Sequence, residues 1–122
     1  MLPVLIVEDN PAFGSALQAA LKARFPFLDL TTATGAQQAM EDIDALHPEL
    51  IFMDVVLPDG NGLEITKRLR ASGNNAKVIV MSSHDIPEYG DEAIRCGANH
   101  FIGKSSLDLG ELFALVDAML AH

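Results

Sequence analysis

At residues 50–60 the chain reads LIFMDVVLPDG, an apolar run that ends in an acid and then in turn-forming residues. Four apolar residues in a row favour a strand that is covered on both faces, as in a parallel sheet. Pro58 and Gly60 predict that the chain turns out of the sheet immediately afterwards. We therefore expect Asp54 at the open carboxyl end of a buried strand, the edge where open α/β sheets bind ligands.

A second acidic group ends the first apolar run of the chain. Glu8 and Asp9 follow that run, and Asn10 with Pro11 then predicts the start of a helix, because Asn is a good N-cap and Pro suits the first helical position. Taken singly, these acids have plainer interpretations: Asp54 could be held by backbone N–H groups, and the pair could complement a helix dipole. Three carboxylates at one sheet edge, however, form a set of hard oxygen ligands that suits Mg²⁺.

The rest of the chain alternates apolar, strand-like runs with amphipathic helical patterns. Expected strands cover residues 4–7, 29–32, 50–53, 78–81 and 100–102, and expected helices cover 11–24, 36–46, 63–71, 89–96 and 107–120. The first of these helices has Phe13, Leu17 and Leu21 on one apolar face, which is expected to contact the core. Five such units predict a doubly wound α/β domain, in which a parallel sheet has right-handed crossovers and helices on both faces. Because no linker, repeat or low-complexity stretch divides the chain, residues 1–122 are expected to form one domain.

The composition argues against several classes of protein. Seventeen acidic residues against eight basic ones give a formal net charge of −9, whereas nucleic-acid binding needs clustered Lys and Arg. No apolar run approaches the roughly 18 residues of a membrane span, and the N-terminus lacks the basic region of a secretory signal. Cys96 is the only cysteine, so no internal disulfide can form, and a cytoplasmic location is expected.

Two further polar groups fall at the same expected edge of the sheet. Ser82 follows the strand 78–81, and Lys104 follows the strand 100–102. A lysine ammonium beside carboxylates would neutralise part of their charge and could hold a phosphoryl oxygen. Each residue alone fits a plainer interpretation, a turn serine or a solvated lysine. Together with the three acids they indicate a phosphoryl-transfer site.

Four motifs in this order resemble those of the receiver domains of two-component response regulators. They are LIVED at residues 5–9, MD at 53–54 with LPDGNG at 57–62, VMSS at 80–83 and GANHFIGK at 97–104. The resemblance covers the whole chain and implies a flavodoxin-like (βα)5 fold, with five parallel strands in the order 2-1-3-4-5. That order would make the first and third strands neighbours and would bring the three acids together.

The resemblance also implies how the acids act. Asp54 would accept a phosphoryl group from a phosphohistidine on a sensor histidine kinase or a phosphotransfer protein. Mg²⁺, or alternatively Mn²⁺, would be held by Asp9, Asp54 and the backbone carbonyl of Val56, with Glu8 acting through water. Such a domain would not be a dedicated enzyme, because it catalyses only the phosphorylation and dephosphorylation of its own aspartate.

The remaining implied roles concern the phosphoryl group and the signal. Ser82 would bind the phosphoryl group, Lys104 would pair with it, and Phe101 occupies the family's aromatic switch position. The surface that changes would be formed by the helix 89–96, the strand 100–102 and the helix 107–120. A homodimer through that surface, or a transcriptional output, is an arrangement that the resemblance allows.

One departure from the family pattern follows the lysine. Ser105 stands where many receivers have a proline in a cis bond, and without Pro a cis bond costs roughly 2.5–4 kcal/mol. A Lys-Ser pair there resembles receivers that are joined to helix-turn-helix DNA-binding domains. Val56 and His84 lie beside the expected site and could tune hydrolysis, in a direction that the sequence leaves open. For His84 an ordinary exposed loop residue is the slightly favoured interpretation.

Other classes fit the residues less well. A phosphatase of the haloacid dehalogenase type needs a second Asp two positions after the nucleophile, where this chain has Val56. An FMN carrier needs a hydroxyl- and Gly-rich loop after the first strand, where Glu8 and Asp9 would repel a phosphate. The remaining alternative is a non-phosphorylated pseudo-receiver that acts only as a protein-binding module, although such domains usually lack one of the acids, the hydroxyl or the lysine.

Overall fold

A parallel five-stranded sheet forms the middle layer of the computed structural model, which describes residues 2–83 and 87–120. Its strands are β1 (Leu2–Val7), β2 (Leu28–Ala33), β3 (Leu50–Asp54), β6 (Lys77–Ser82) and β7 (His100–Gly103). They stand in the order β2-β1-β3-β6-β7, and every neighbouring pair is parallel. Counted along the chain these five strands have the order 2-1-3-4-5, so the flavodoxin-like fold is confirmed.

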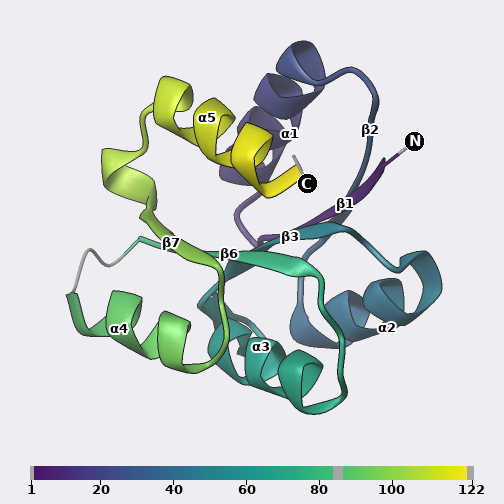
Figure 1. Cartoon of the computed structure of the whole chain (residues 1–122), viewed down its shortest axis with the longest axis vertical. Helices are drawn as coiled ribbons and strands as arrows, with labels where there is room; N and C mark the ends of the chain where they lie inside the picture. The colour runs from purple at the N-terminus through teal and green to yellow at the C-terminus, as the bar shows by residue number, and fades with distance from the viewer. Residues whose placement is uncertain (1, 84–86, 121–122) are drawn as a thin grey trace.

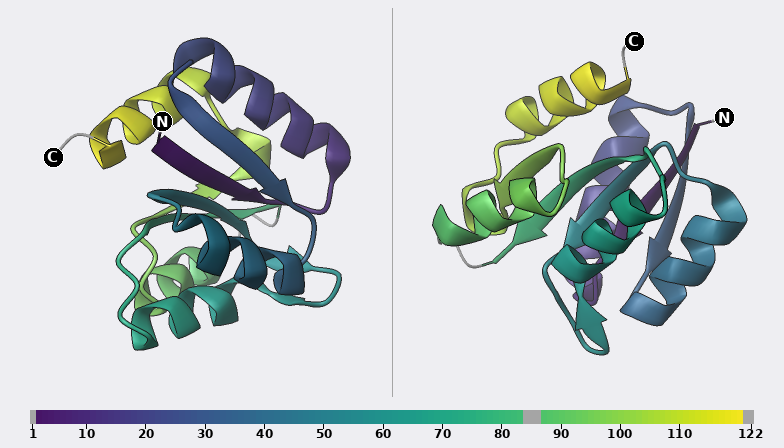
Figure 2. Two further views of the ribbon diagram at one scale, coloured as in Figure 1. Left: turned by 90° about the vertical axis from the view of Figure 1, so that its right-hand side faces the viewer. Right: turned by 60° about the horizontal axis from the view of Figure 1, so that its bottom comes forward.

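Helices cover both faces of the sheet (Figures 1 and 2). One face carries α1 (Pro11–Arg24) and α5 (Leu109–Leu120), and the other carries α2 (Ala36–Leu46), α3 (Gly62–Ala71) and α4 (Pro87–Arg95). Each side of the sheet therefore has its own apolar core. None of the helices in the described ranges has the length and apolar character needed to cross a bilayer.

The packing of β3 explains why residues 50–53 are all apolar. Ile51 and Met53 pack into the core beneath α2, α3 and α4, while Leu50 and Phe52 pack into the core beneath α1 and α5. All four side chains are fully buried. Burying each one stabilises the fold by roughly 1.5–3 kcal/mol, and this fixes the register that puts Asp54 at the end of the strand.

The structure differs from the sequence-based expectation near the ends of elements. A two-stranded hairpin, β4 (Val56–Leu57) with β5 (Gly60–Asn61), follows β3 and was not predicted. A short 3-10 turn, η1 (Lys104–Ser106), follows β7. The last helix begins at Leu109 and not at residue 107, because Asp108 caps it: Asp108 Oδ1 accepts a hydrogen bond from the backbone N–H of Gly110 at 3.1 Å. The fourth helix begins at Pro87 and ends at Arg95, two residues before Gly97, whose φ of 104° suits glycine.

The hairpin is fastened to α2 by a side chain. The carboxylate of Asp59 accepts hydrogen bonds from the backbone N–H groups of Ala36, at 2.6 Å, and Gln37, at 3.1 Å. These bonds hold the pKa of Asp59 below its usual range. Gly35, at the N-cap of α2, has no side chain to make them. A residue of the loop that follows Asp54 therefore caps α2, a helix that lies earlier in the sequence.

Candidate functional site

Three carboxylates meet at the carboxyl edge of the sheet, as the sequence predicted. Glu8 and Asp9 follow β1, Asp54 ends β3, and the two strands are paired through Val7 and Met53. One carboxylate oxygen from each acid lies within 4.8 Å of the others. Glu8 and Asp54 are buried, whereas Asp9 is exposed. Such a cluster of hard oxygen atoms could hold a metal ion.

The turn between β1 and α1 fixes the first acid. The backbone N–H of Asn10 donates to Glu8 Oε2 at 3.0 Å. The Asn10 side chain in turn caps α1, because its Oδ1 accepts from the N–H groups of Ala12, at 3.0 Å, and Phe13, at 3.2 Å. The N-cap predicted from the sequence is therefore present, and it sets the helix directly beside the acidic cluster.

Lys104 reaches into the cluster from the end of β7. Its Nζ lies 2.5 Å from Glu8 Oε1 and 3.1 Å from Asp54 Oδ2, and its side chain is only 14% exposed. Burial acts to lower the pKa of Lys104, but the bonds to Glu8 and Asp54 outweigh it and raise that pKa. The ammonium therefore stays charged and neutralises part of the acidic edge.

Asp54 sits in an environment that disfavours its charge. Burial, followed by the nearby charge of Glu8, raises the pKa of Asp54 to about 6, although Lys104 offsets part of the effect. Two buried carboxylates share one ammonium in this arrangement. A divalent cation bound by the acids would relieve the remaining repulsion.

The loop after Asp54 is held tightly against the sheet. The backbone N–H of Val55 donates to the carbonyl of Met81 at 3.0 Å, and that of Gly62 donates to the carbonyl of Val55 at 2.9 Å. A Cβ added to Gly62 would stand 2.0 Å from the carbonyl oxygen of Asp54. The close approach of α3 to the end of β3 therefore requires glycine at that position.

The acids and the lysine line a pocket of about 530 Å³. Its lining residues are Glu8, Asp9, Asn10, Phe13, Asp54, Val56, Ser83, Lys104 and Ser105. Val56 is 57% exposed and lines this pocket. The bond between Lys104 and Ser105 is trans. His84, which we expected beside the site, lies outside the described residues.

Ser82 and Phe101 lie on the neighbouring strands β6 and β7. Ser82 is buried at the end of β6 and pairs in register with Gly103, while its neighbour Ser83 lines the pocket. Phe101 is half-buried on β7 and faces α4, where a Cβ on Gly90 would lie 3.5 Å from its ring. Ser82 therefore lies at the carboxyl end of β6, and the ring of Phe101 lies against α4.

Phe13 is the pocket residue whose place the sequence did not reveal. Its position in the first turn of the helix suggested only a core contact, yet its ring lies over Lys104, with Nζ 4.9 Å from the ring centroid. A usable signal was present, because side chains in the first turn of a helix point back toward its N-terminus. Here that direction leads to the acidic edge.

The model of the response regulator receiver domain matches residues 4–117 of the chain. The chain belongs to this family. Receiver domains serve two-component signalling, interact with histidine kinases or phosphotransfer proteins, and are generally not dedicated enzymes. The acidic cluster and the lysine at the carboxyl edge of the sheet lie within the matched residues.

Individual relatives agree with this assignment. The receiver is 33% identical to the chemotaxis protein CheY of Thermotoga maritima over 83% of each chain. It is 30% identical to a putative transcriptional regulator of Pseudomonas aeruginosa, covering 99% of this chain but 58% of that protein. Its fold matches the receiver domain of a DNA-binding response regulator from Colwellia psychrerythraea with a TM-score of 0.94, at 21% identity and full coverage of both chains.

Proposed function

We propose that residues 1–122 act as one cytoplasmic receiver that accepts a phosphoryl group on Asp54 from a phosphohistidine donor. The observation that carries the proposal is the Asp54 carboxylate, which shares the sheet edge with two more acids and lies 3.1 Å from the Lys104 ammonium. The donor is a sensor histidine kinase or a phosphotransfer protein. The net charge of −9 makes direct nucleic-acid binding by this domain unfavourable.

The chemistry requires little beyond position and charge. An oxygen of Asp54 attacks phosphorus in line, the P–N bond to the donor imidazole breaks, and its electron pair stays on that nitrogen. Lys104 pairs with a phosphoryl oxygen, and the Ser82 hydroxyl donates a hydrogen bond to another.

The acids prepare the site for a divalent cation. Asp9, Asp54 and the carbonyl of Val56 would hold Mg²⁺, or alternatively Mn²⁺, with Glu8 acting through water. When bound, the ion neutralises charge on the phosphoryl oxygens. The donor set supports this assignment, because all of its atoms are oxygens and carboxylates of this kind suit Mg²⁺.

Acetyl phosphate, a small-molecule donor, tests the transfer directly. In the presence of Mg²⁺ the chain is expected to gain one acid-stable, base-labile phosphoryl group, measured by intact mass. EDTA should prevent the gain, because the uncompensated carboxylates then repel the donor. A chain that stays unmodified at saturating Mg²⁺ would contradict the proposal and favour a pseudo-receiver that only binds partners.

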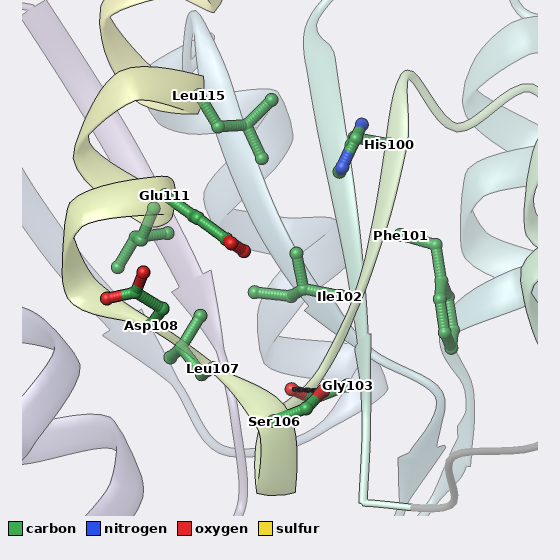
Figure 3. Close-up of a pocket in the computed structure, with 10 residues that line it drawn as sticks. His100, Phe101, Ile102, Gly103, Ser106, Leu107, Asp108, Glu111 and Leu115 are labelled. Atoms are coloured by element: carbon green, nitrogen blue, oxygen red, sulfur yellow. Dashed lines mark hydrogen bonds between the residues drawn. The ribbon is translucent and has the colours of Figure 1, made fainter.

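We further propose that phosphorylation changes the face formed by α4, β7 and α5. A phosphoryl dianion offers Ser82 a charge-assisted hydrogen bond, which is roughly twice as strong as a neutral one. Movement of Ser82 toward Asp54 would open space next to β7 for the ring of Phe101. This face includes a pocket of about 320 Å³ between β7 and α5, from which Phe101 points away (Figure 3). A second copy of the domain or an output domain, including a transcriptional one, would bind there.

Beryllium fluoride, which mimics a phosphoryl group, tests this switch without turnover. With Mg²⁺ it is expected to shift the amide resonances of residues 54–62 and also those of residues 89–104, because Ser82 and Phe101 couple the two regions. Residues 71–77 lie at the amino-terminal end of β6, away from the acidic edge. They serve as the internal control, and their amide resonances should not shift. Shifts confined to residues 54–62 would rule out the proposed coupling from Asp54 through Ser82 and Phe101 to the face formed by α4, β7 and α5.

A further inference from the structure

We infer that Phe13 is a positioning residue for phosphoryl transfer, in which the face of its ring holds the Lys104 ammonium against Glu8 and Asp54. The inference rests on the proposed role of Asp54 and adds to it a residue that touches neither the phosphoryl group nor the metal. Phe13 lines the same pocket as the acids and the lysine.

The geometry of the ring and the ammonium supports a specific attraction. Lys104 Nζ lies 4.9 Å from the centroid of the Phe13 ring, within the roughly 6 Å at which a cation is attracted to an aromatic face. The backbone of Phe13 is fixed, because Asn10 Oδ1 accepts a hydrogen bond from its N–H at 3.2 Å. The capped first turn of α1 therefore presents the ring to the site.

Three contacts of the ammonium with residues that the structure describes differ in kind. Glu8 Oε1 and Asp54 Oδ2 are charged contacts, whereas the ring is neutral. Because the Lys104 side chain is only 14% exposed, water competes weakly and the cation–π attraction is stronger than on an open surface. The ring thus limits the rotamers of the long, flexible Lys104 side chain, which would otherwise sample several.

The neutral contact matters most when the charged ones change. A metal ion held at the acidic cluster would compete with Lys104 for Glu8 and Asp54, and phosphorylation of Asp54 would alter one of these partners again. Phe13 has no group that binds a metal or reacts with phosphate, so its attraction for the ammonium persists through these steps. Lys104 therefore stays in position to pair with a phosphoryl oxygen as negative charge develops on that oxygen.

A series of fluorinated phenylalanines at position 13 tests the attraction separately from packing. Each added fluorine weakens the negative charge on the ring face with little change in shape. The rate of labelling by acetyl phosphate with Mg²⁺ is expected to fall stepwise from the mono- to the trifluorinated ring. Phe13→Leu, which keeps apolar bulk without a ring, should lower the rate roughly 3- to 20-fold, the range that corresponds to loss of a partly desolvated cation–π contact.

Phe113 provides the matched control. It lies half-buried on α5, edge-on to Phe25 with ring centroids 5.9 Å apart, and packs against the core beneath α1 and α5. The same fluorinated residues at position 113 should leave the labelling rate unchanged. If wild type is labelled and trifluorination of Phe13 does not slow it, the inference is wrong although the proposed function stands. If wild type is not labelled, the proposed function itself fails.

A second measurement needs no phosphorylation. The ε-methylene protons of Lys104 should be shifted upfield by the ring current of Phe13 in the unmodified protein, and Phe13→Leu should remove that shift. Thermal melting of the variant shows whether it is folded. Absence of an upfield shift in the wild type would overturn the inference, because the ring would then not lie over the lysine.

Discussion

Asp54→Asn is expected to lower acyl phosphate formation by roughly a thousandfold or more, the scale on which enzymes lose activity when a nucleophile is removed. An amide oxygen is a poor nucleophile for phosphorus, and no other residue is proposed to take its place. Asn has nearly the same shape as Asp, so packing at the end of β3 should be retained. The measurement is the intact mass after incubation with acetyl phosphate and Mg²⁺.

The same variant should not lose stability at neutral pH. A carboxyl whose pKa is raised in the folded state binds its proton more tightly there, so ionisation at higher pH destabilises the fold. The pKa of Asp54 is raised to about 6, chiefly by burial and then by Glu8. Removing this charge should therefore leave the melting temperature at neutral pH unchanged or slightly higher in metal-free buffer.

The matched control is Asp29→Asn, which changes an exposed acid on β2 far from the carboxyl edge. Its labelling should equal that of the wild type. Labelling that persists in Asp54→Asn at the wild-type rate would place the nucleophile elsewhere, with Asp9 the first residue to substitute next. If both Asp54→Asn and Asp29→Asn lost labelling, the cause would be the change in the net charge of the protein and not the loss of a nucleophile at Asp54.

The acidic edge could be predicted from the sequence because local rules determine it. A continuous apolar run requires a strand covered on both faces, and the turn residues after it fix where that strand ends. Glu8, Asp9 and Asp54 follow such runs, whereas Lys104 follows a shorter one, Phe101 and Ile102, after Gly103. Parallel strands end at one edge, but the strand order that makes β1 and β3 neighbours came from the resemblance to receiver domains and not from local patterns.

Contacts between distant segments could not be predicted in this way. The hairpin β4–β5 and its bond to α2 depend on Asp59, whose partners lie 22 and 23 residues earlier in the chain. Periodicity assigned Phe13 to a buried face, but not the lysine on β7 that its ring covers. Contacts between such distant residues depend on how whole helices and strands pack against one another. The periodicity of a single segment carries no information about that packing.

Gly62→Ala is expected to be strongly destabilising, by roughly 2–4 kcal/mol of the 5–15 kcal/mol that typically holds a domain together. The new Cβ would stand 2.0 Å from the carbonyl oxygen of Asp54 and 2.7 Å from Cγ of Met53. The first contact is with backbone, so no side-chain rotation can relieve it. Helix α3 would have to move away from β3, which strains the bond from the Gly62 N–H to the Val55 carbonyl.

Urea unfolding followed by circular dichroism measures this effect, with Gly110→Ala as the matched control. A Cβ at Gly110 meets only the Asp108 carboxylate, at 3.7 Å or more, and Ala in a helix is favoured over Gly by roughly 0.5–1 kcal/mol. The control should therefore unfold at the same or a higher urea concentration than the wild type, while Gly62→Ala unfolds at a much lower one. Because the clash falls on Asp54 itself, Gly62→Ala should also slow labelling under conditions where it is still folded. A urea midpoint for Gly62→Ala equal to that of the wild type would show that α3 does not lie as close to the end of β3 as described.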